Sequence, residues 1–175
     1  MKEKTSTKDL RLSSNERIFF ESKPVFKPKK YKNINPKGLK FYTFNAGFKK
    51  KSKDLLIVIF DNLANNYCVY SNTSTPSAPI LWDKKNNKGK CKALVVNSGN
   101  ANAHTGIEGI KIINNYVKKL SKKISCNENQ ILVSSTGVIG ETFDPKLIIR
   151  QLSKINYCKQ SNMLQAAKSI MTTDT

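Results

Sequence analysis

The sequence predicts an α/β fold, a layered sandwich in which helices cover a sheet. Short apolar runs suited to buried strands occur at residues 54–60, 92–96 and 131–134. An amphipathic stripe with helical spacing separates the last two runs, and two shorter helical patterns follow it. Strands that alternate with helices in this way are typical of layered α/β domains.

The chain has 175 residues, enough for one domain and a short appendage. Residues 1–35 are polar and basic and contain two Lys-Pro pairs, so we expect a poorly ordered N-terminal arm. The sequence Asn-Pro-Lys-Gly at residues 35–38 is a turn signal. The predicted folded domain therefore covers residues 36–175.

The first two predicted strands lie on either side of a basic loop. Residues 41–48 are expected to form one strand and residues 54–60 the next, a buried one. The lysine-rich residues 49–53 between them are interpreted as a solvated hairpin tip. Further short strands are expected at residues 67–71, 92–96 and 131–134, with a polar loop at residues 83–90.

Three helices are predicted in the second half of the chain. Thr105 is the expected N-cap of the first, Asp144 followed by Pro145 marks the start of the second, and Ser161 is expected to cap the third. The apolar faces expected to pack inward are Ile107, Ile110, Ile113, Val117, Leu120 and Ile124 in the first helix, Leu147, Ile148, Leu152 and Ile155 in the second, and Leu164, Ala167 and Ile170 or Met171 in the third.

The charge of the chain is strongly positive and unevenly distributed. The formal net charge is +19, and residues 1–53 hold 16 Lys and Arg against 4 Asp and Glu. Aromatic residues interleave with these lysines, as in proteins that bind single-stranded nucleic acid, but no RNP, KH or zinc-knuckle pattern accompanies them. A positive surface also attracts anionic metabolites, so nucleic acid is not the favoured partner.

Several classes of protein and of site are disfavoured. The longest apolar run is too short to span a bilayer, and the N-terminus lacks the apolar core of a secretion signal, so we expect no membrane association and a cytoplasmic location. Four widely spaced cysteines and one histidine predict reduced thiols and no metal site. We interpret His104 as a loop-packing residue, with a catalytic base as the alternative.

Two segments rich in small and polar residues follow predicted strands, at residues 97–106 and 134–140. Turns at strand ends present backbone N–H groups and short side chains to ligands, so the two segments suggest a shared site. In the second segment, the hydroxyl of Thr136 lies beside Gly137, whose N–H can approach a ligand closely. Such donors can hold the oxyanion of a tetrahedral intermediate. The alternative is a plain strand–turn–helix whose glycines only serve the turn.

These motifs together resemble the N-terminal half of the ornithine acetyltransferase family, the bifunctional glutamate N-acetyltransferases and amino-acid acetyltransferases of arginine biosynthesis. The resemblance covers about residues 36–175 and leaves residues 1–35 unexplained. It rests on residues 97–103, 105–106, 135–140, 166–167 and 170–175, with residues 37–38, 54–55, 71–72 and 78–79 upstream.

The resemblance implies a fold, a reaction and a set of site residues. Members are α/β sandwiches whose precursor cleaves itself between an alanine and a threonine, and the α and β chains assemble into a heterotetramer-type particle. The N-terminal threonine of the β chain takes acetyl from N-acetylornithine and passes it to glutamate, and in some members acetyl-CoA is also a donor. Thr136 and Gly137 would form the oxyanion hole and Thr172 would contact the substrate. No cofactor or metal is implied.

The cleavage junction of the family is expected to follow Thr175. We therefore expect this chain to be an α-chain portion that ends before the cleavage site, incomplete without the β half and inactive alone. Two alternatives stay open. One is a non-catalytic remnant or a basic binding module, and the other is a related self-processing N-terminal hydrolase such as an aminopeptidase, although residues 97–103 favour the acetyltransferase.

Overall fold

The computed structural model describes residues 36–156 and 158–173 of the chain. The predicted arm at residues 1–35 lies outside this described part. The helices and strands are β1 (Leu39–Phe44), β2 (Leu55–Asn65), α1 (Ala78–Asn86), β3 (Lys90–Asn100), α2 (Gly106–Ile124), β4 (Ile131–Val138), α3 (Lys146–Leu152) and α4 (Met163–Ile170), with short 3₁₀ turns at Glu128–Gln130 and Ser153–Asn156.

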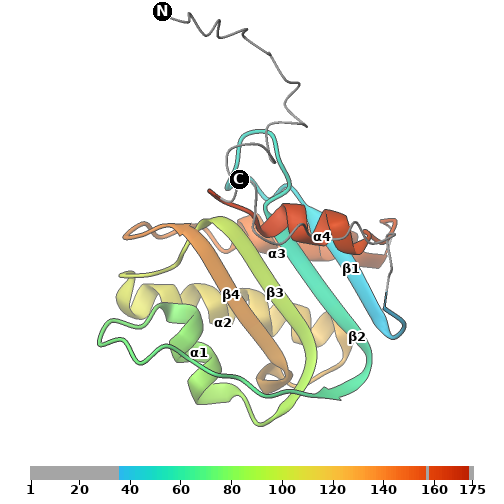
Figure 1. Cartoon of the computed structure of the whole chain (residues 1–175), viewed down its shortest axis with the longest axis horizontal. Helices are drawn as coiled ribbons and strands as arrows, with labels where there is room; N and C mark the ends of the chain where they lie inside the picture. Colours follow the sequence, from blue (N-terminus) through green and yellow to red (C-terminus); the bar gives the residue numbers. More distant parts are fainter. Residues whose placement is uncertain (1–35, 157, 174–175) are drawn as a thin grey trace, which may run out of the picture. The chain divides into compact units, whose positions relative to one another are not determined.

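One four-stranded sheet with the strand order β1-β2-β3-β4 forms the centre of the fold. β1, β2 and β3 pair antiparallel, whereas β3 and β4 pair parallel. A parallel pair needs a long crossover connection, and α2 provides it. Figure 1 shows α2 and α4 on opposite faces of the sheet. This arrangement confirms the predicted layered α/β class.

β2 explains how the sheet holds the two helical layers. Leu55 and Ile57 pack into the larger core beneath α1, α2 and α3, while Leu56 and Val58 pack into a smaller core against Ala166 of α4. All four β2 side chains are buried. A strand covered on both faces reads as a continuous apolar run, which is why the sequence predicted a buried strand here.

The helix predicted from the amphipathic stripe is α2, and its end at Ile124 agrees with the prediction. Its buried face includes Ile112 and Tyr116, which the predicted stripe left out. Ile107 was wrongly placed in the core, since its side chain is 78% exposed. It precedes Ile112 by five residues, and at 3.6 residues per turn the two point nearly opposite ways. Thr105 precedes the helix as expected, but its hydroxyl makes no capping hydrogen bond.

Two predictions for the segment between β2 and β3 are wrong. Residues 67–71 form no strand, and the Tyr67 side chain is 92% exposed. The apolar residues there have no neighbouring strand within the described part of the chain to pair with. The expected polar loop at residues 83–90 is shorter than predicted, because α1, a weakly amphipathic helix with a proline in its first turn, continues to Asn86 and only residues 87–89 form the loop. Its buried anchor is Trp82.

The start of α3 lies close to the predicted position. α3 begins at Lys146, and Pro145 before it already has helical backbone angles. The carboxylate of Asp144 accepts a hydrogen bond from the Lys146 N–H at 2.8 Å. The helical start signal at Asp144 and Pro145 is therefore confirmed to within one residue.

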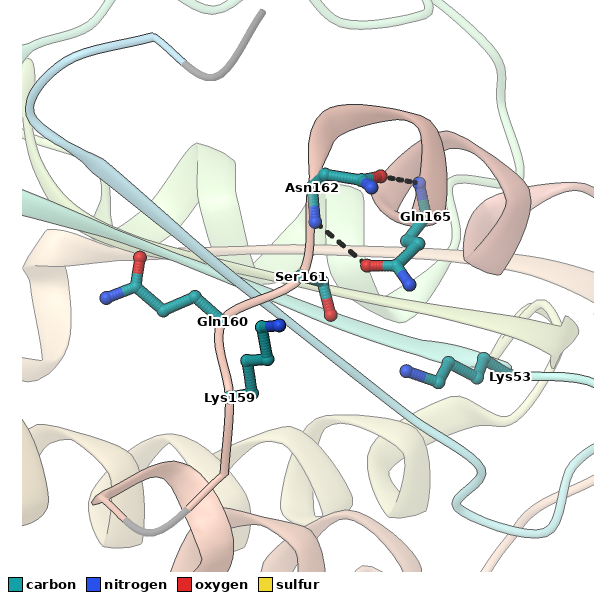
Figure 2. Close-up of a pocket in the computed structure, with 6 residues that line it drawn as sticks. All are labelled: Lys53, Lys159, Gln160, Ser161, Asn162 and Gln165. Carbon is teal, nitrogen blue, oxygen red and sulfur yellow. Dashed lines mark hydrogen bonds between the residues drawn. The ribbon is translucent and has the colours of Figure 1, made fainter. Parts of the chain in front are cut away.

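α4 is capped differently from the prediction. The side chain of Asn162 accepts from the Gln165 N–H at 2.8 Å, and the side chain of Gln165 accepts from the Asn162 N–H at 2.9 Å (Figure 2). This reciprocal pair is a capping box. Ser161, the predicted cap, instead donates its N–H to the carbonyl of Phe41 in β1 at 2.7 Å.

The face of α4 that packs on the sheet was also predicted wrongly. Ala166 and Ser169 are buried, whereas the predicted inward residues Leu164, Ala167 and Ile170 are exposed. The larger apolar side chains therefore point outward, since the helix approaches β1, β2 and β3 through its small residues.

A buried aspartate organises the connection between β1 and β2. The side chain of Asp54 is fully buried and accepts hydrogen bonds from the N–H groups of Ala46 at 2.6 Å, Gly47 at 3.2 Å and Lys49 at 2.8 Å. The carboxylate thus supplies a hydrogen-bond acceptor to three N–H groups of the loop backbone that would otherwise lack one. The lysine-rich residues 50–53 lie exposed, which confirms the predicted hairpin tip.

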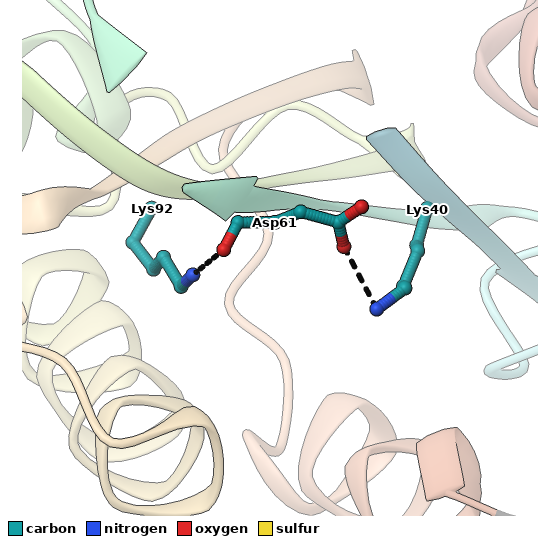
Figure 3. Close-up of polar contacts among 3 residues, drawn as sticks. All are labelled: Lys40, Asp61 and Lys92. Carbon is teal, nitrogen blue, oxygen red and sulfur yellow. Dashed lines mark hydrogen bonds and ion pairs between the residues drawn. The ribbon is translucent and has the colours of Figure 1, made fainter. Parts of the chain in front are cut away.

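A surface ion pair between β1 and β2 offers a contrast. Lys40 and Asp61 form an ion pair with a 2.7 Å separation, and Lys92 donates to the main-chain carbonyl of Asp61 at 2.7 Å (Figure 3). Both members of the ion pair are more than two-fifths exposed, so water and salt screen their attraction.

Substitution of Asp54 tests the role of this carboxylate. Asp54→Ala should lower the free energy of unfolding by about 3 kcal/mol or more, because three backbone N–H groups lose their acceptor. Urea denaturation of the purified chain measures this change. The control is Asp61→Ala in β2, seven residues further along the chain, for which we expect a small effect. Similar losses for the two variants would contradict the assignment.

Candidate functional site

The two segments that the sequence singled out meet at the carboxyl ends of β3 and β4. Ser98 is in register with Thr136, and Gly99 is in register with Gly137. The prediction that these segments come together is therefore confirmed. They are not loops as expected, because β3 continues to Asn100 and β4 to Val138 as paired strand ends.

Glycine is required where these strand ends touch. Gly99 has φ +110° and Gly137 has φ +130°, a region that side chains rarely allow. A Cβ on Gly137 would lie 2.3 Å from the carbonyl carbon of Gly99, and one on Gly99 would lie 2.9 Å from the Cβ of Phe48. The two backbones therefore pack directly against each other, and the strand register shifts at this point.

The asparagine side chains of the first segment serve the fold. Asn97 is buried, donates to the carbonyl of Asn100 at 2.7 Å and accepts from the hydroxyl of Ser135 at 2.6 Å. Asn100 accepts from the Asn102 N–H at 2.8 Å and donates to the carbonyl of Glu141 at 2.9 Å. The expectation that these short side chains face a ligand is wrong for the asparagines, because their amides are used inside the protein.

Asn102 continues this network into α2. It has a left-handed backbone, with φ +45°, and its side-chain amide donates to the carbonyl of Gly109 at 3.1 Å. The hydroxyl of Thr105 donates to the Asn102 side chain at 2.8 Å. Satisfied buried polar networks of this kind hold a backbone in one arrangement. The strand ends are therefore fixed from β3 through to the start of α2.

Thr136 and Gly137, in the second of the two segments, remain accessible to solvent. Thr136 is partly exposed and Gly137 is exposed. Register with Ser98 places Thr136 on the face of the sheet that carries α4, but α4 packs against β1, β2 and β3. Within the described residues, the Thr136 hydroxyl has no hydrogen-bond partner. It is free to donate to a ligand at this end of β4.

Thr172 is brought to the same end of the sheet. The buried hydroxyl of Ser98 donates to the carbonyl of Ser169 near the end of α4 at 2.7 Å. α4 ends at Ile170, and the main-chain carbonyl of Met171 accepts a hydrogen bond from Lys49. Thr172 follows directly and is exposed. No pattern in the sequence indicates that Ser98 anchors this helix end.

His104 does not have its predicted packing role. Its side chain is exposed, and its backbone is left-handed with φ +55°. The residue lies at the turn before α2, where the backbone conformation rather than side-chain packing sets its position. This interpretation from the sequence is therefore wrong.

A cavity of about 500 Å³ lies beside the open end of β4. Residues 67–71, the start of α1 and the β4 residues Ser134 and Ser135 line it. Ser134 and Ser135 directly precede Thr136, so the cavity offers room for part of a ligand next to that hydroxyl. The sequence missed this cavity because it predicted a strand and a loop where the wall lies.

Asp83 of α1 covers the outer edge of β4 within this cavity. Its carboxylate accepts from the Val133 N–H at 3.2 Å, and the neighbouring Trp82 donates its ring N–H to the carbonyl of Ile131 at 3.4 Å. Burial raises the pKa of Asp83 from 3.8 to about 7, and the hydrogen bond from Val133 offsets part of that rise.

Two kinds of feature are absent from the described residues. No group of three or more His, Cys, Asp or Glu side chains in residues 36–156 and 158–173 is arranged to hold a metal ion. None of the helices in that part of the chain has the length and apolar character needed to cross a membrane.

Comparison with known proteins identifies the family. The model of the ArgJ family matches residues 40–175. The chain belongs to the ArgJ family. This finding confirms the family that the sequence motifs predicted.

ArgJ relatives resemble the chain over most of its length. The arginine biosynthesis bifunctional protein ArgJ of Agrobacterium fabrum is 38% identical over 152 residues, which cover 85% of this chain and 37% of that protein. The ArgJ protein of Caldanaerobacter subterraneus is 36% identical over 143 residues, which cover 80% of this chain and 35% of that protein. The chain therefore spans little more than a third of the length of these relatives.

Two solved structures share the fold. The crystal structure of ArgJ from Bacillus halodurans matches with a TM-score of 0.70 and 30% identity, over 79% of this chain and 74% of that chain. Ornithine acetyltransferase from Mycobacterium tuberculosis, solved in complex with ornithine, matches with a TM-score of 0.72 and 24% identity, over 79% of this chain and 78% of that chain.

Two glycine substitutions test the contact between the strand ends. Gly137→Ala should destabilise the chain by roughly 3 kcal/mol or more, because its Cβ meets backbone atoms that cannot move independently. Gly140→Ala is the control, since Gly140 has φ +86° but open space around it, and it should cost about 1–2 kcal/mol from backbone strain alone. Thermal and urea unfolding measure both, and equal losses would argue against the contact.

The buried Asp83 predicts a dependence of stability on pH. Its folded pKa lies above its unfolded value, so the folded state holds a proton that the unfolded state has released. This residue should therefore lower stability as pH rises from about 4 to about 7. Asp83→Asn keeps an acceptor for the Val133 N–H without the charge.

The measurement for Asp83 is urea unfolding at several pH values. Asp83→Asn should match the unsubstituted chain near pH 4 and be more stable by about 2 kcal/mol at pH 8, a value reduced for the partial exposure of the group. The control is Glu141→Gln, which removes an exposed carboxylate but retains Asp83, so its stability should follow the same dependence on pH as that of the unsubstituted chain. A constant difference between Asp83→Asn and the unsubstituted chain at all pH values would contradict the prediction.

Proposed function

We propose that this chain supplies the oxyanion-binding part of an ornithine acetyltransferase, which transfers acetyl from N-acetylornithine to glutamate in arginine biosynthesis. The observation that carries the proposal is the strand end at Gly137. There, the Thr136 hydroxyl lies open beside a glycine whose backbone is exposed, in a chain of the ArgJ family.

Thr136 and Gly137 act on the carbonyl oxygen of the acetyl group. When a nucleophile adds to the carbonyl carbon, negative charge develops on that oxygen. The hydroxyl of Thr136 and the N–H of Gly137 donate hydrogen bonds to it, and fixed donors of this kind stabilise the transition state more than the substrate. The contact between Gly99 and Gly137 supports this role, because it holds the donors before the substrate arrives.

The nucleophile in this proposal is the N-terminal threonine of a β chain released by self-cleavage of a longer precursor. Its hydroxyl attacks the acetyl carbon, the amide C–N bond breaks, and ornithine leaves with a proton. The amine of glutamate then attacks the acetyl-threonine ester and releases the threonine hydroxyl. Acetyl-CoA is a second donor to be tested in the same assay.

Thr172 is proposed to contact the substrate. It lies past the end of α4, at the end of the sheet that Thr136 also occupies, and the bond from Ser98 to Ser169 holds that helix end in place. The ornithine bound to the Mycobacterium tuberculosis enzyme supports an amino-acid substrate for the family.

The partner in this proposal is a β chain that completes the site. The length of the relatives supports a β chain, since the ArgJ relatives are nearly three times as long as the segment that they share with this chain. We therefore propose that residues 36–175 form an α-chain portion and that this portion is inactive without the β chain.

Reconstitution tests the proposed function. The chain is to be co-expressed with the remaining portion of the Agrobacterium fabrum relative, and formation of N-acetylglutamate from N-acetylornithine and glutamate is measured. We expect turnover from the co-purified pair and none from the 175-residue chain alone. Thr136→Ala should lower kcat by about 10²–10³-fold, the usual loss when one oxyanion donor is removed.

Two variants make the reconstitution specific. Thr136→Ser keeps the hydroxyl and should restore most of the activity, while Ser52→Ala removes an exposed hydroxyl from the loop before β2 and should leave kcat nearly unchanged. Turnover by the chain alone, or equal losses in Thr136→Ala and Ser52→Ala, would refute the assignment.

A further inference from the structure

A second cavity lies at the opposite edge of the sheet from Thr136. Its volume is about 400 Å³, and it sits at the start of α4 beside β1. β1 and β4 are the two outer strands, so this cavity is separate from the proposed acetyl-transfer site. The lining residues are Lys53, Lys159, Gln160, Ser161, Asn162 and Gln165.

The cavity is positively charged without a compensating carboxylate. Two of its lining residues are lysines, and none is Asp or Glu. The ion pairs among the described residues involve Lys40 and Lys111, not these two lysines. Figure 2 shows the ammonium groups of Lys53 and Lys159 directed toward each other from opposite sides of the cavity. Two like charges facing one space repel, and an anion between them removes that cost.

A chain of hydroxyl groups fixes one side of the cavity. Lys53 donates to the Thr43 hydroxyl at 2.7 Å, and the Thr43 and Ser161 hydroxyls lie 2.7 Å apart. An ammonium group has only hydrogens to donate, so the Thr43 oxygen accepts from it. Thr43 can then donate its own hydrogen to Ser161, which leaves the Ser161 hydrogen for a ligand. Ser161 is buried, so its position is set by packing.

The first turn of α4 adds a side-chain donor. The capping box between Asn162 and Gln165 occupies the Gln165 N–H and the carbonyl oxygen of the Gln165 side chain. The amide nitrogen of that side chain is left over, and Figure 2 shows it pointing away from the capping bond. The polar groups that face this cavity are therefore mainly donors.

We propose that this cavity binds a phosphate dianion, either inorganic phosphate or a phosphate monoester of a small metabolite. A phosphate group carries close to two negative charges at neutral pH and accepts through several oxygens, which matches two ammonium groups and a hydroxyl. A phosphate group alone would not fill the cavity, so an organic part has room. Phosphate binding at this cavity does not depend on acetyl transfer at the other edge of the sheet.

Binding joins three segments that are distant in the sequence. Lys53 precedes β2, Thr43 lies in β1, and residues 159–162 lead into α4. A ligand that binds the folded but not the unfolded chain raises stability in proportion to the logarithm of its concentration. Phosphate should therefore raise the unfolding temperature of the chain.

The experiment measures binding to the full chain by calorimetry and thermal unfolding, at an ionic strength held constant with sodium chloride. The probes are inorganic phosphate, glycerol phosphate and the dicarboxylate succinate. We expect saturable binding of both phosphates, with a rise in the unfolding temperature, and at least tenfold weaker binding of succinate. If inorganic phosphate binds tightly and glycerol phosphate does not bind, the site is assigned to the free phosphate ion.

Three lysine variants decide whether the cavity is responsible. Lys159→Gln and Lys53→Gln should each weaken phosphate binding by about tenfold or more, because each removes a charge-assisted hydrogen bond. Lys50→Gln removes the same charge from an exposed residue of the same loop and should change binding by less than twofold. Unfolding temperatures without phosphate check that each variant is folded. If one of the two cavity variants does not fold, the other is enough to test the site.

Several results would overturn the proposal. They are the absence of saturable phosphate binding, a loss in Lys50→Gln as large as in the cavity variants, and binding of succinate as tight as that of phosphate. An equal loss in Lys50→Gln would mean that the general positive charge of the chain attracts phosphate. Equally tight binding of succinate would mean that the cavity does not select phosphate.

Discussion

The close approach of two backbones at Gly99 and Gly137 is the constraint on which the candidate site depends. A Cβ on Gly137 would lie 2.3 Å from the carbonyl carbon of Gly99, so the parallel strands can reach this position only through glycine. The contact fixes the end of β4, and with it the direction in which Thr136 faces. It also requires β3 and β4 to lie side by side, which the crossover through α2 makes possible.

The buried amides around this contact explain why so many polar residues are needed there. Asn97, Asn100 and Asn102 each donate a side-chain hydrogen bond to a main-chain carbonyl, and Asn97 also accepts one from the Ser135 hydroxyl. These amides are therefore used inside the protein, whereas the Thr136 hydroxyl and the backbone of Gly137 remain accessible to solvent. A site built in this way is organised before any ligand arrives, which is what stabilisation of a developing charge requires.

α4 connects the two ends of this architecture. Near its C-terminal end, the bond from Ser98 to Ser169 ties the helix to β3 close to Thr136. Just before its N-terminal end, Ser161 bonds to β1 through Phe41 and through the Thr43 hydroxyl. The small residues that pack beneath the helix let it lie close to the sheet, so one helix contacts both the positively charged cavity and the end of the sheet that carries the candidate acetyl-transfer site.

The sequence by itself determined the fold class, the family and the elements with strong periodicity, such as β2 and α2, because buried strands and amphipathic helices are encoded by local patterns of apolar residues. Tertiary structure decided which polar groups remain open. Asn97 and Thr136 have similar surroundings in the sequence, but only pairing across β3 and β4 makes one a structural amide and the other a partly exposed hydroxyl without a partner among the described residues. The outward face of α4 and the buried Asp83 were missed for the same reason, since their partners are distant in the sequence and no local pattern records them.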